Sequence, residues 1–490
     1  MRWSLTGTEG PRIVFEMLRE LNRNPSELDR LIEAKMRAAG IATPTITSFL
    51  GAVHKVLAGE TGLLPESSII PISSLPELDR VRAGGGASSL LQQLAVVKLN
   101  GGLGTSMGLD RVKSLIAVKG QETFLDFIAR QIFYLRGGAT AADPAFYLMD
   151  SFNTQKDTLD YLGKYPGLGE NGRLDFLQNM VPKIDASTLE PVSWPAQPDL
   201  EWCPPGHGDL YPALLGSGLL EHLLAKGVKY LFVSNADNLG ATVDLGLLRY
   251  FAEGDLSFLM EVAERTASDR KGGHLARQRA NGRLVLRESA QCPKEDEAAF
   301  QDIQRHRFFN TNNLWVRLED LKSALDRNGG ALSLALIKNA KTVDARQPDS
   351  PKVLQLESAM GAAIECFEKA GAVVVPRTRF APVKTTSDLL ALRSDAYRVT
   401  EDFRLVLAEV RQGKPPVVDL DSQYYKLLPD FESRFALGIP SLLECDSIKV
   451  SGNVHFAAGV GCRGKVEFVN PLAAAKTVPA GNYTNVQIEF

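Results

Sequence analysis

The sequence predicts an α/β fold with a mixed, mainly parallel sheet between helices, preceded by a helical segment and followed by a β-helix. Short apolar runs alternate with amphipathic helical patterns between residues 86 and 400, which is typical of a doubly wound domain. The pattern before that region is helical, and apolar pairs after it recur every six residues. We therefore expect an N-terminal helical segment over 1–85, a central domain over 86–400, linking helices over 401–437 and a β-helix over 438–490.

The N-terminal segment carries the signals of a helix start. Asn24 is suited to cap a helix, Pro25 to occupy its first position and Glu27 its third. These signals predict an amphipathic helix, because apolar residues then recur at helical spacing, at Leu28, Leu31, Ile32 and Met36.

The central domain begins after a stretch of small residues over 83–89. Its first strand is expected over 94–99, and a helix over 123–136 should end at Gly137 and Gly138. Two later apolar runs suit strands that are buried on both faces. We expect these strands over 230–233 and 372–375, each preceded by a helix, over 210–225 and 357–369.

The C-terminal segment has a period of its own. Glycines lie at or near the expected corners, at Gly452, Gly459 and Gly464. A six-residue repeat of short strands predicts a few coils of β-helix. A small antiparallel meander remains the alternative. The apolar pairs are Ile448/Val450, Val454/Phe456, Val460/Cys462 and Val466/Phe468.

Composition excludes several classes of protein. The 490 residues are 44% hydrophobic and 23% charged, which is a globular composition. Because 55 basic and 58 acidic side chains nearly cancel, we expect no nucleic-acid partner. No run approaches the roughly 18 to 20 apolar residues of a membrane helix, so we expect no membrane contact and a cytoplasmic location.

The cysteines are five in number and far apart in the sequence. They form neither a disulfide framework nor a zinc-binding pattern. We expect small buried hydrophobes in a reducing compartment, at Cys203, Cys292, Cys366, Cys445 and Cys462.

A glycine-rich loop follows the first predicted strand. Gly102, Gly104 and Gly108 would let the backbone approach a ligand and direct its N–H groups at anionic or carbonyl oxygens. Their spacing matches neither the dinucleotide fingerprint nor the P-loop. Lys113 follows and would place a cation over any bound phosphates. A purely structural turn is the alternative.

Two further residues suit phosphate chemistry. Asp237 comes where the strand over 230–233 runs out, at the edge where open α/β sheets bind ligands. A single carboxylate there suits Mg²⁺, although an N-cap or an Asx turn is the alternative. Lys384 lies in a hydroxyl-rich loop after an apolar run and could contact a second phosphate, although surface lysines usually have no such role.

Histidine and amide side chains suit a sugar. His207 stands between two glycines and could donate to a hydroxyl or a phosphate, although an isolated histidine is more often structural. Asn310, Asn312 and Asn313 precede the apolar run that starts at Leu314. Amides both donate and accept, which suits neutral hydroxyls, whereas a turn cluster is the alternative.

Five motifs in order closely resemble the eukaryotic-type UTP–glucose-1-phosphate uridylyltransferase family. They are KLNGGLGTSMG, PPGHGD, SNADNLGATVD, FNTNNLWV and RFAPVKTTSDLL, and the likeness covers nearly the whole chain beyond residue 90. The resemblance implies a Rossmann-like nucleotidyltransferase core after an N-terminal helical part, a left-handed β-helix at the C-terminus, and a requirement for Mg²⁺.

The resemblance also implies roles for individual residues. At the end of the loop, Arg111 and Val112 stand where the family usually has Gly-Pro; this changes the backbone options but keeps the spacing to Lys113. The implied nucleotide contacts are the backbone of Leu99, Asn100, Gly101 and Gly102 at the uracil, Gln178 at the uracil edge, Lys113 at the UTP phosphates, Gly206 against the nucleotide, and Asn235 near the ribose or sugar. The implied sugar-phosphate contacts are His207, Gly273, Asn310, Asn312, Glu357 and Lys384, and Asp237 would hold the Mg²⁺.

The implied reaction is attack of glucose 1-phosphate on the α-phosphorus of UTP, with pyrophosphate leaving in line. Lys113, Lys384 and Asp237 would carry the catalysis by neutralising charge. One alternative is the same chemistry on another sugar 1-phosphate, such as the N-acetylhexosamine or galactose form. A second is a non-catalytic UDP-sugar sensor or scaffold, and a dehydrogenase is disfavoured by the glycine spacing. The β-helix could also mediate a homo-oligomer.

Overall fold

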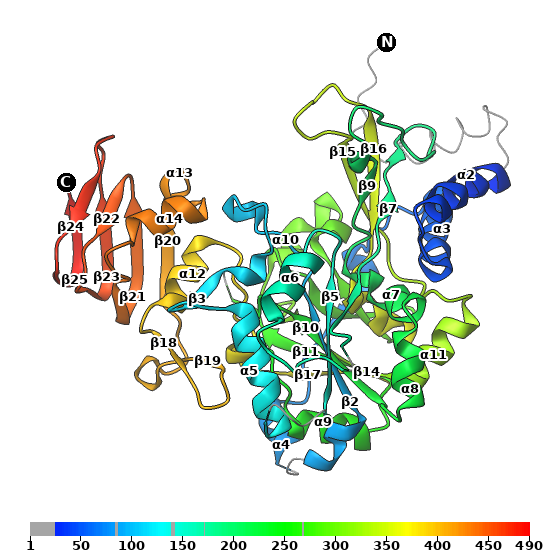
Figure 1. Ribbon diagram of the computed structural model, residues 1–490, viewed down its shortest axis with the longest axis horizontal. Helices are drawn as coiled ribbons and strands as arrows, with labels where there is room; N and C mark the ends of the chain where they lie inside the picture. The colour runs from blue at the N-terminus through cyan, green and yellow to red at the C-terminus, as the bar shows by residue number, and fades with distance from the viewer. Residues whose placement is uncertain (1–24, 84–86, 139–142, 171, 267–268) are drawn as a thin grey trace. The chain divides into compact units, whose positions relative to one another are not determined.

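The computed structural model describes residues 25–490 except 84–86, 139–142, 171 and 267–268. The chain forms two compact units, each built from three stretches of sequence (Figure 1). Unit 1 comprises Met1–Ala95, Phe176–Val233 and Leu245–Val375, and unit 2 comprises Val96–Asp175, Ser234–Asp244 and Pro376–Phe490.

A ten-stranded sheet carries the order β1-β12-β14-β10-β2-β5-β6, with β11, β13 and β17 off this path. β14 is antiparallel to both β10 and β11, whereas β11 is parallel to β17, so the predicted mixed α/β fold is confirmed. The bounds are β1 Ile69–Pro71, β2 Leu94–Leu99, β5 Ala145–Asp150, β6 Asp175–Leu177, β10 Tyr230–Asn235, β11 Phe258–Glu264, β12 His274–Gln278, β13 Leu284–Arg287, β14 Phe308–Arg317 and β17 Ala370–Val374.

Strands β2 and β10 each pass from unit 1 into unit 2. They are hydrogen-bonded neighbours in both units. In unit 1 the Lys229 N–H donates to the Gln93 carbonyl (2.9 Å), and in unit 2 the Ala236 N–H donates to the Leu99 carbonyl (3.0 Å). The loops at the carboxyl ends of both strands therefore begin side by side within unit 2.

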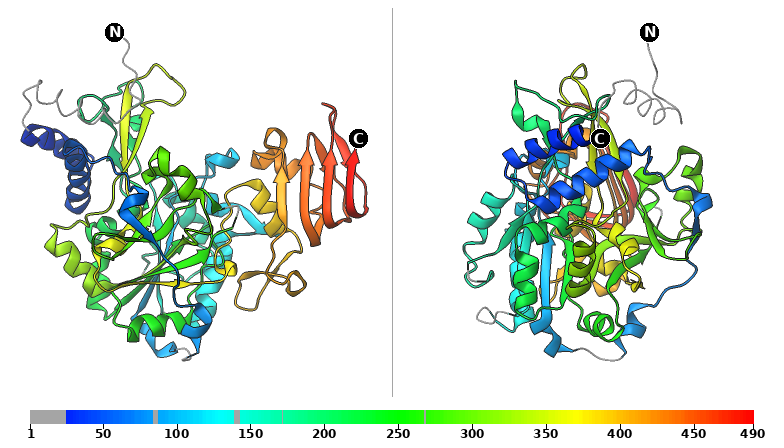
Figure 2. Two further views of the ribbon diagram at one scale, coloured as in Figure 1. Left: turned by 180° about the vertical axis from the view of Figure 1, so that it is seen from behind. Right: turned by 90° about the vertical axis from the view of Figure 1, so that its right-hand side faces the viewer.

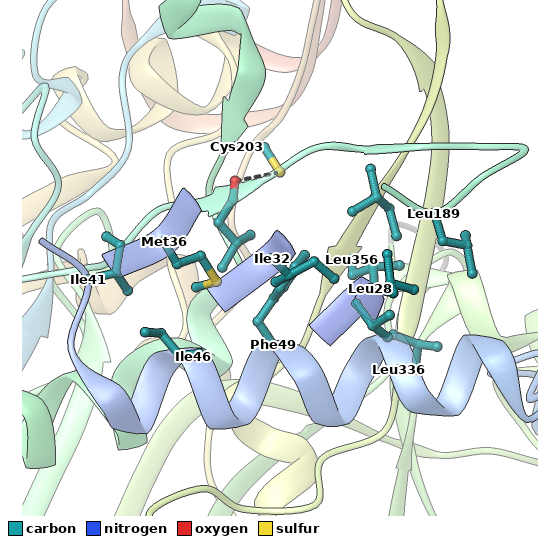
Figure 3. Close-up of a cluster of buried hydrophobic side chains, with 13 residues drawn as sticks. Leu28, Ile32, Met36, Ile41, Ile46, Phe49, Leu189, Cys203, Leu336 and Leu356 are labelled. Carbon is teal, nitrogen blue, oxygen red and sulfur yellow. Dashed lines mark hydrogen bonds between the residues drawn. The ribbon is translucent and has the colours of Figure 1, made fainter. Parts of the chain in front are cut away.

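Helices α2 (Pro25–Ala38) and α3 (Thr43–Leu57) share one apolar cluster in unit 1 (Figure 3). α2 starts at Pro25 as predicted, whereas the proposed cap Asn24 lies outside the described residues. Ile32 is fully buried and Phe49 is 4% exposed, while Leu31 on the other side of α2 is 45% exposed. The helical spacing thus divides α2 into a buried and a solvated face.

We expect Ile32→Ala to lower the free energy of unfolding by about 2–5 kcal/mol, because it removes a buried side chain and leaves a cavity. Leu31→Ala is the matched control and should change stability by no more than ~0.5 kcal/mol, since an exposed side chain is lost. Urea unfolding followed by circular dichroism measures both. Equal effects of the two substitutions would contradict the burial pattern of α2.

The helix predicted over 123–136 is confirmed. α5 (Phe124–Arg136) is capped by Thr123, which exchanges hydrogen bonds with Asp126, and it ends at Gly137 with φ +75°. The helix predicted over 210–225 is instead two helices, α7 (Leu210–Gly216) and α8 (Leu219–Ala225), because Gly218 takes φ +71° between them.

The helix predicted over 357–369 is wrong. Strand β16 (Lys352–Glu357) occupies its start and pairs with β15 (Ile337–Thr342), and a 3₁₀ helix, η10 (Met360–Cys366), follows. The residues from Met360 to Ile364 are all buried, so this run has no solvated face to mark an α-helix.

Shorter elements complete the two units. Among the described residues, no helix is long and apolar enough to cross a membrane. In unit 1 they are α4 Leu78–Arg82, β7 Val181–Pro182, β8 Ile184–Asp185, β9 Trp202–Cys203, α9 Leu245–Glu253, α10 Glu297–Gln301 and α11 Leu318–Arg327. In unit 2 they are β3 Ala117–Lys119, β4 Glu122–Thr123, α6 Gln155–Leu162, α12 Thr386–Arg393, β18 Tyr397–Val399, β19 Leu405–Leu407, α13 Ser422–Tyr425 and α14 Leu428–Arg434.

The C-terminal strands are parallel, so the antiparallel meander is wrong (Figures 1 and 2). Ile448 pairs with Val466 and Val450 with Phe468, so predicted apolar pairs stack with an offset of 18 residues, three six-residue repeats. The sheet order is β20 (Val417–Leu420), β21 (Ser441–Ser451), β23 (Val460–Val469) and β25 (Gly481–Glu489), and β22 (Val454–Phe456) pairs with β24 (Lys476–Val478) in parallel.

Three of the five cysteines are buried as expected. Burial raises the pKa of Cys203 and Cys462 to about 12 and that of Cys445 to about 11. These side chains are therefore neutral thiols at physiological pH and act as small hydrophobes.

Two histidines stack in the interior of unit 1. The rings of His274 and His306 lie 3.8 Å apart and nearly parallel, and both side chains are fully buried. Neither nitrogen of His274 has a hydrogen-bond partner among the described residues. Burial lowers the pKa of both histidines, and that of His274 falls well below its usual value. The Arg287 guanidinium lowers both pKa values further, whereas Glu66, which pairs with His306, raises the pKa of His306.

This pair predicts that unit 1 loses stability in mild acid. The histidines of the unfolded chain take up protons near pH 6.5, whereas the folded histidines stay neutral. The contribution of the pair to the free energy of unfolding is therefore fully present above that pH and is lost as the pH falls below it. Each histidine contributes a slope of up to about 1.4 kcal/mol per pH unit. Urea unfolding between pH 7 and 5 should therefore show a steeper decline for wild type than for His274→Phe, and parallel declines would contradict this.

Candidate functional site

The predicted site residues fall into two groups, one in each unit. In unit 1 they are Gln178, Gly206, His207, Gly273, Asn310, Asn312 and Glu357, and in unit 2 they are Leu99, Asn100, Gly101, Gly102, Lys113, Asn235, Asp237 and Lys384.

In unit 2, the glycine-rich loop is held at its first residue. The Asn100 side chain is 4% exposed; it donates to a carboxylate oxygen of Asp150 (2.7 Å) and to the Thr158 hydroxyl (2.9 Å). It also accepts a hydrogen bond from Ser114 (2.5 Å). The side chain of Asn100 is thus engaged within the protein, where it fixes the start of the loop.

Asp150 is a site-supporting residue that the sequence analysis missed. It ends β5, it is fully buried, and burial raises its pKa to about 7. The signal was available, because a carboxylate at the end of an apolar strand is the pattern that identified Asp237. Its contact with Asn100, 50 residues earlier, could not be read from the sequence.

The end of the loop is a narrow turn that brings Lys113 back. Leu103 and Val112 form an antiparallel bridge, and the Lys113 N–H donates to the Gly102 carbonyl (3.2 Å). Val112 has φ −55°, close to the value that proline imposes, and it is fully buried. Arg111 has a negative φ. The Arg-Val pair therefore supplies a backbone that does not depend on the family's Gly-Pro.

Lys113 and Asp237 form an ion pair. The lysine Nζ lies 2.5 Å from Oδ2 of Asp237, and the two side chains are 17% and 21% exposed. Oδ1 of Asp237 is buried and has no hydrogen-bond partner among the described residues. Asp237 follows β10, so the two predicted residues from different loops do meet.

Asn238 joins the Asp237 loop to the segment that carries Lys384. Its Oδ1 accepts from the Ala381 N–H (3.0 Å), and its Nδ2 donates to the Arg379 carbonyl (3.1 Å). The Val383 N–H donates to the Asp237 carbonyl (3.3 Å). The side chain of Asn238 is 1% exposed, and the sequence analysis assigned it no role.

Lys384 stands exposed just before α12. Its N–H donates to the Asp388 carboxylate (2.9 Å), which also accepts from the backbone of the cap residue Thr385. The start of α12 thus sets the backbone of Lys384. Asn235 is placed by the loop that follows it, since its carbonyl accepts from the Asn238 N–H (3.2 Å).

In unit 1, His207 is a neutral donor. The Met360 N–H donates to Nδ1 of His207 (2.9 Å), and burial lowers the pKa of His207 to about 4. A nitrogen that accepts carries no proton, so the ring proton is assigned to Nε2. The predicted role of His207 as a hydrogen-bond donor therefore falls to Nε2–H.

Glycine is required before this histidine. Gly206 has φ +79°, and a Cβ there would collide with the Ser358 carbonyl oxygen. The same carbonyl accepts from the Gly208 N–H (2.9 Å), and Nε2 of Gln178 donates to the Gly206 carbonyl (3.0 Å). Ser358 follows Glu357 directly, so Gln178, Gly206 and Glu357 meet here.

The amide cluster lies inside β14, not before the strand as expected. The pairing with β11 shifts between Glu261 and Val262, and Asn312 takes φ +59°, which makes a β-bulge. Nδ2 of Asn310 donates to Oδ1 of Asn312 (2.7 Å). Asparagine tolerates the left-handed conformation, and bulges commonly redirect side chains beside functional sites.

The last two residues of the group in unit 1 are placed by neighbouring strands. The Asn310 N–H donates to the Gly273 carbonyl (3.3 Å), and a Cβ at Gly273 would collide with the Glu288 carboxylate. Oε1 of Glu357 accepts from Nδ2 of Asn339 (2.8 Å). Contacts within unit 1 thus connect the seven predicted residues in two sets. Gly273, Asn310 and Asn312 form one set, and Gln178, Gly206, His207 and Glu357 form the other.

The metal prediction rests on Asp237. Within the described part of the chain, no three His, Cys, Asp or Glu side chains are grouped as a metal site. A hard cation such as Mg²⁺ takes one or two carboxylates and completes its shell with waters and substrate phosphates. The unpartnered Oδ1 of Asp237 fits this mode of binding.

Comparison with known proteins agrees with these features. The family model described as UTP–glucose-1-phosphate uridylyltransferase matches residues 48–463. The enzyme of that name from Solanum tuberosum is 38% identical over 474 residues, covering 94% of this chain and 96% of that protein. That from Saccharomyces cerevisiae is 44% identical over 395 residues, covering 80% of this chain and 77% of that protein.

Solved structures are similar over the same extent. Open and closed structures of the UDP-glucose pyrophosphorylase from Leishmania major give a TM-score of 0.89 at 48% identity, covering 94% of this chain and 99% of that one. A UDP-glucose phosphorylase from Trypanosoma brucei gives 0.86 at 50% identity, covering 95% and 100%. The chain therefore belongs to the UTP–glucose-1-phosphate uridylyltransferase family.

Proposed function

We propose that this protein transfers a uridylyl group from UTP to glucose 1-phosphate, giving UDP-glucose and pyrophosphate. The observation that carries the proposal is the Lys113–Asp237 pair beside the glycine-rich loop, in a member of this family. A UDP-sugar sensor or scaffold would need the loop but neither the cation nor the metal carboxylate.

The reaction needs no protein nucleophile, because the attacking phosphate oxygen is already ionised at neutral pH. The barrier comes from the repulsion between two polyanions and from the charge that develops on the leaving pyrophosphate. Lys113 and Lys384 would offset this charge at the UTP and sugar phosphates. Mg²⁺ held by Asp237 would supply further neutralisation of the phosphates.

The remaining residues would orient the substrates. The backbone of Leu99, Asn100, Gly101 and Gly102 would face the uracil, and the Gln178 amide can donate to one ring carbonyl while accepting from the ring N–H. Asn235 would contact the ribose or the sugar. Nε2–H of His207 would donate to a phosphate or hydroxyl oxygen, and the sugar would lie against Gly273, Asn310, Asn312 and Glu357.

Asn238 is expected to act by positioning. Asn238→Ala removes the hydrogen bonds that join the Asp237 loop to Arg379 and Ala381, and it should lower kcat by about 10- to 100-fold, since small misplacements of catalytic groups are costly. Steady-state kinetics of Asn238→Ala, Lys384→Ala and the double variant test this. Losses that multiply fully would contradict a shared cause.

Pyrophosphate release with Mg²⁺, UTP and a panel of sugar 1-phosphates tests the proposed function. Strong preference for glucose 1-phosphate over the galactose and N-acetylglucosamine forms is the expected result. Preference for another sugar would keep the mechanism and change the substrate. Tight binding of UDP-glucose without pyrophosphate release from any sugar would favour the sensor.

The C-terminal strands extend the proposal to assembly. The parallel pairing, with an offset of 18 residues between Ile448 and Val466, favours a left-handed β-helix, whose edge strand β25 could pair with a second copy. Light scattering of the full chain tests whether it forms a homo-oligomer. The division into 1–85, 86–400, 401–437 and 438–490 and the cytoplasmic location stay predictions.

A further inference from the structure

We infer that Lys113 is the counter-ion of Asp237 before any ligand binds. A divalent cation must then displace Lys113 from Asp237, and a nucleotide phosphate must displace Asp237 from Lys113. This inference rests on the proposed function for the identity of the two ligands. The cation takes Asp237 when the phosphates take Lys113, and each ligand therefore promotes binding of the other.

The geometry of the pair supports this exchange. Both side chains are largely shielded, and Nζ of Lys113 lies 2.5 Å from Oδ2 of Asp237. The other oxygen, Oδ1, is buried. A cation that approaches Asp237 thus meets a neutralised carboxylate, one oxygen of which is taken and the other covered.

The backbone on each side fixes the pair in place. The Lys113 N–H is bound to the Gly102 carbonyl, and the Asp237 carbonyl accepts from the Val383 N–H. The side chains can therefore exchange partners while the loops stay where they are. Lys113 follows the glycine-rich loop, so a phosphate bound by that loop competes directly with Asp237 for the ammonium group.

Linkage makes the effect reciprocal. If Lys113 weakens cation binding at Asp237, then Asp237 weakens phosphate binding at Lys113, and removal of either partner strengthens binding of the other's ligand. A lysine that merely adds charge to the phosphate site would leave the affinity of the nucleotide-free protein for a cation almost unchanged. The two roles thus predict different results in the absence of turnover.

The first experiment measures Mn²⁺ binding to the full-length, nucleotide-free protein by electron paramagnetic resonance of free Mn²⁺. Lys113→Met should bind Mn²⁺ at least about tenfold more tightly than wild type, or about 1.4 kcal/mol. Arg111→Met is the matched control, because it removes an exposed cation two residues away, and it should change the affinity less than twofold. The double variant Lys113→Met/Asp237→Asn should lose the gain.

The second experiment measures UTP binding in EDTA by calorimetry. Asp237→Asn should bind metal-free UTP at least about tenfold more tightly than wild type, because its Lys113 is released. Asp110→Asn removes an exposed acid of the same loop and should have less than a twofold effect. Circular dichroism checks that every variant is folded.

Three results would overturn the inference: unchanged Mn²⁺ affinity in Lys113→Met, an equal gain in Arg111→Met, or a gain that survives in the double variant. None of these readouts requires catalysis. If pyrophosphate release is normal while Lys113→Met binds Mn²⁺ as wild type does, the inference fails and the proposed function stands. Absence of release with every sugar tested in wild type would instead remove the proposed function.

Discussion

Asp237→Asn should lower kcat for UDP-glucose formation by at least ~100-fold, the usual loss when one preorganised electrostatic group is removed. The substitution keeps the shape of the side chain but removes the charge that would hold the cation. In the wild type the Lys113 ammonium lies 2.5 Å from an oxygen of Asp237, so the substitution also leaves Lys113 without its negatively charged partner. Pyrophosphate release at saturating UTP and glucose 1-phosphate measures the loss.

Two controls separate this effect from a general change. Asp110→Asn removes an exposed carboxylate and should retain nearly full activity. Raising Mg²⁺ should recover little of the activity of Asp237→Asn, because the ligand itself is missing. Near-normal turnover of Asp237→Asn at ordinary Mg²⁺ would show that the cation is held elsewhere.

Lys384→Ala should also lower kcat by at least ~100-fold, because it removes the cation expected to hold the sugar phosphate while charge develops on the leaving group. The variant should stay folded, since Lys384 is exposed and the cap of α12 is formed by Thr385 and Asp388. Initial rates over a matrix of both substrate concentrations separate the loss in kcat from any change in KM.

A conservative variant sharpens the test of Lys384. Lys384→Arg keeps the charge but replaces a compact ammonium by a planar guanidinium, so it should restore only part of the activity. Lys414→Ala, at an exposed position of the same unit, should have no effect. If Lys384→Ala has an unchanged KM for glucose 1-phosphate and an unchanged kcat, Lys384 does not belong to the site.

Local signals predicted the elements that depend on local physics. The cap at Thr123 and the stop at Gly137 describe interactions within a few residues, and the six-residue period before Phe468 is a repeat that can be counted along the chain. The failures came where distant contacts decided the outcome. Met360 to Ile364 of η10 are all buried, and the left-handed Gly218 divides a helix whose apolar pattern is continuous.

The candidate site likewise contains residues that sequence patterns identified and residues that only the structure revealed. Lys113 and Asp237 could be identified because each follows a strand or loop with a recognisable pattern, and the structure does bring them together. The contacts of Asp150 and Asn238 could not be predicted, because their partners lie 50 or more residues away along the chain. The bulge at Asn312 was not predicted, because an asparagine-rich run looks the same in a turn and in a bulged strand.

The interleaving of the two units has a consequence for how the chain can be made and divided. The chain passes between the units at five points, so neither unit is a continuous segment. During synthesis, unit 1 lacks β17 until residue 374 has emerged, long after residues 96–175 of unit 2 are available to fold. Neither unit can be obtained by cutting the gene once. An exchange of one unit between relatives would need five junctions, three of them inside the strands β2, β6 and β10.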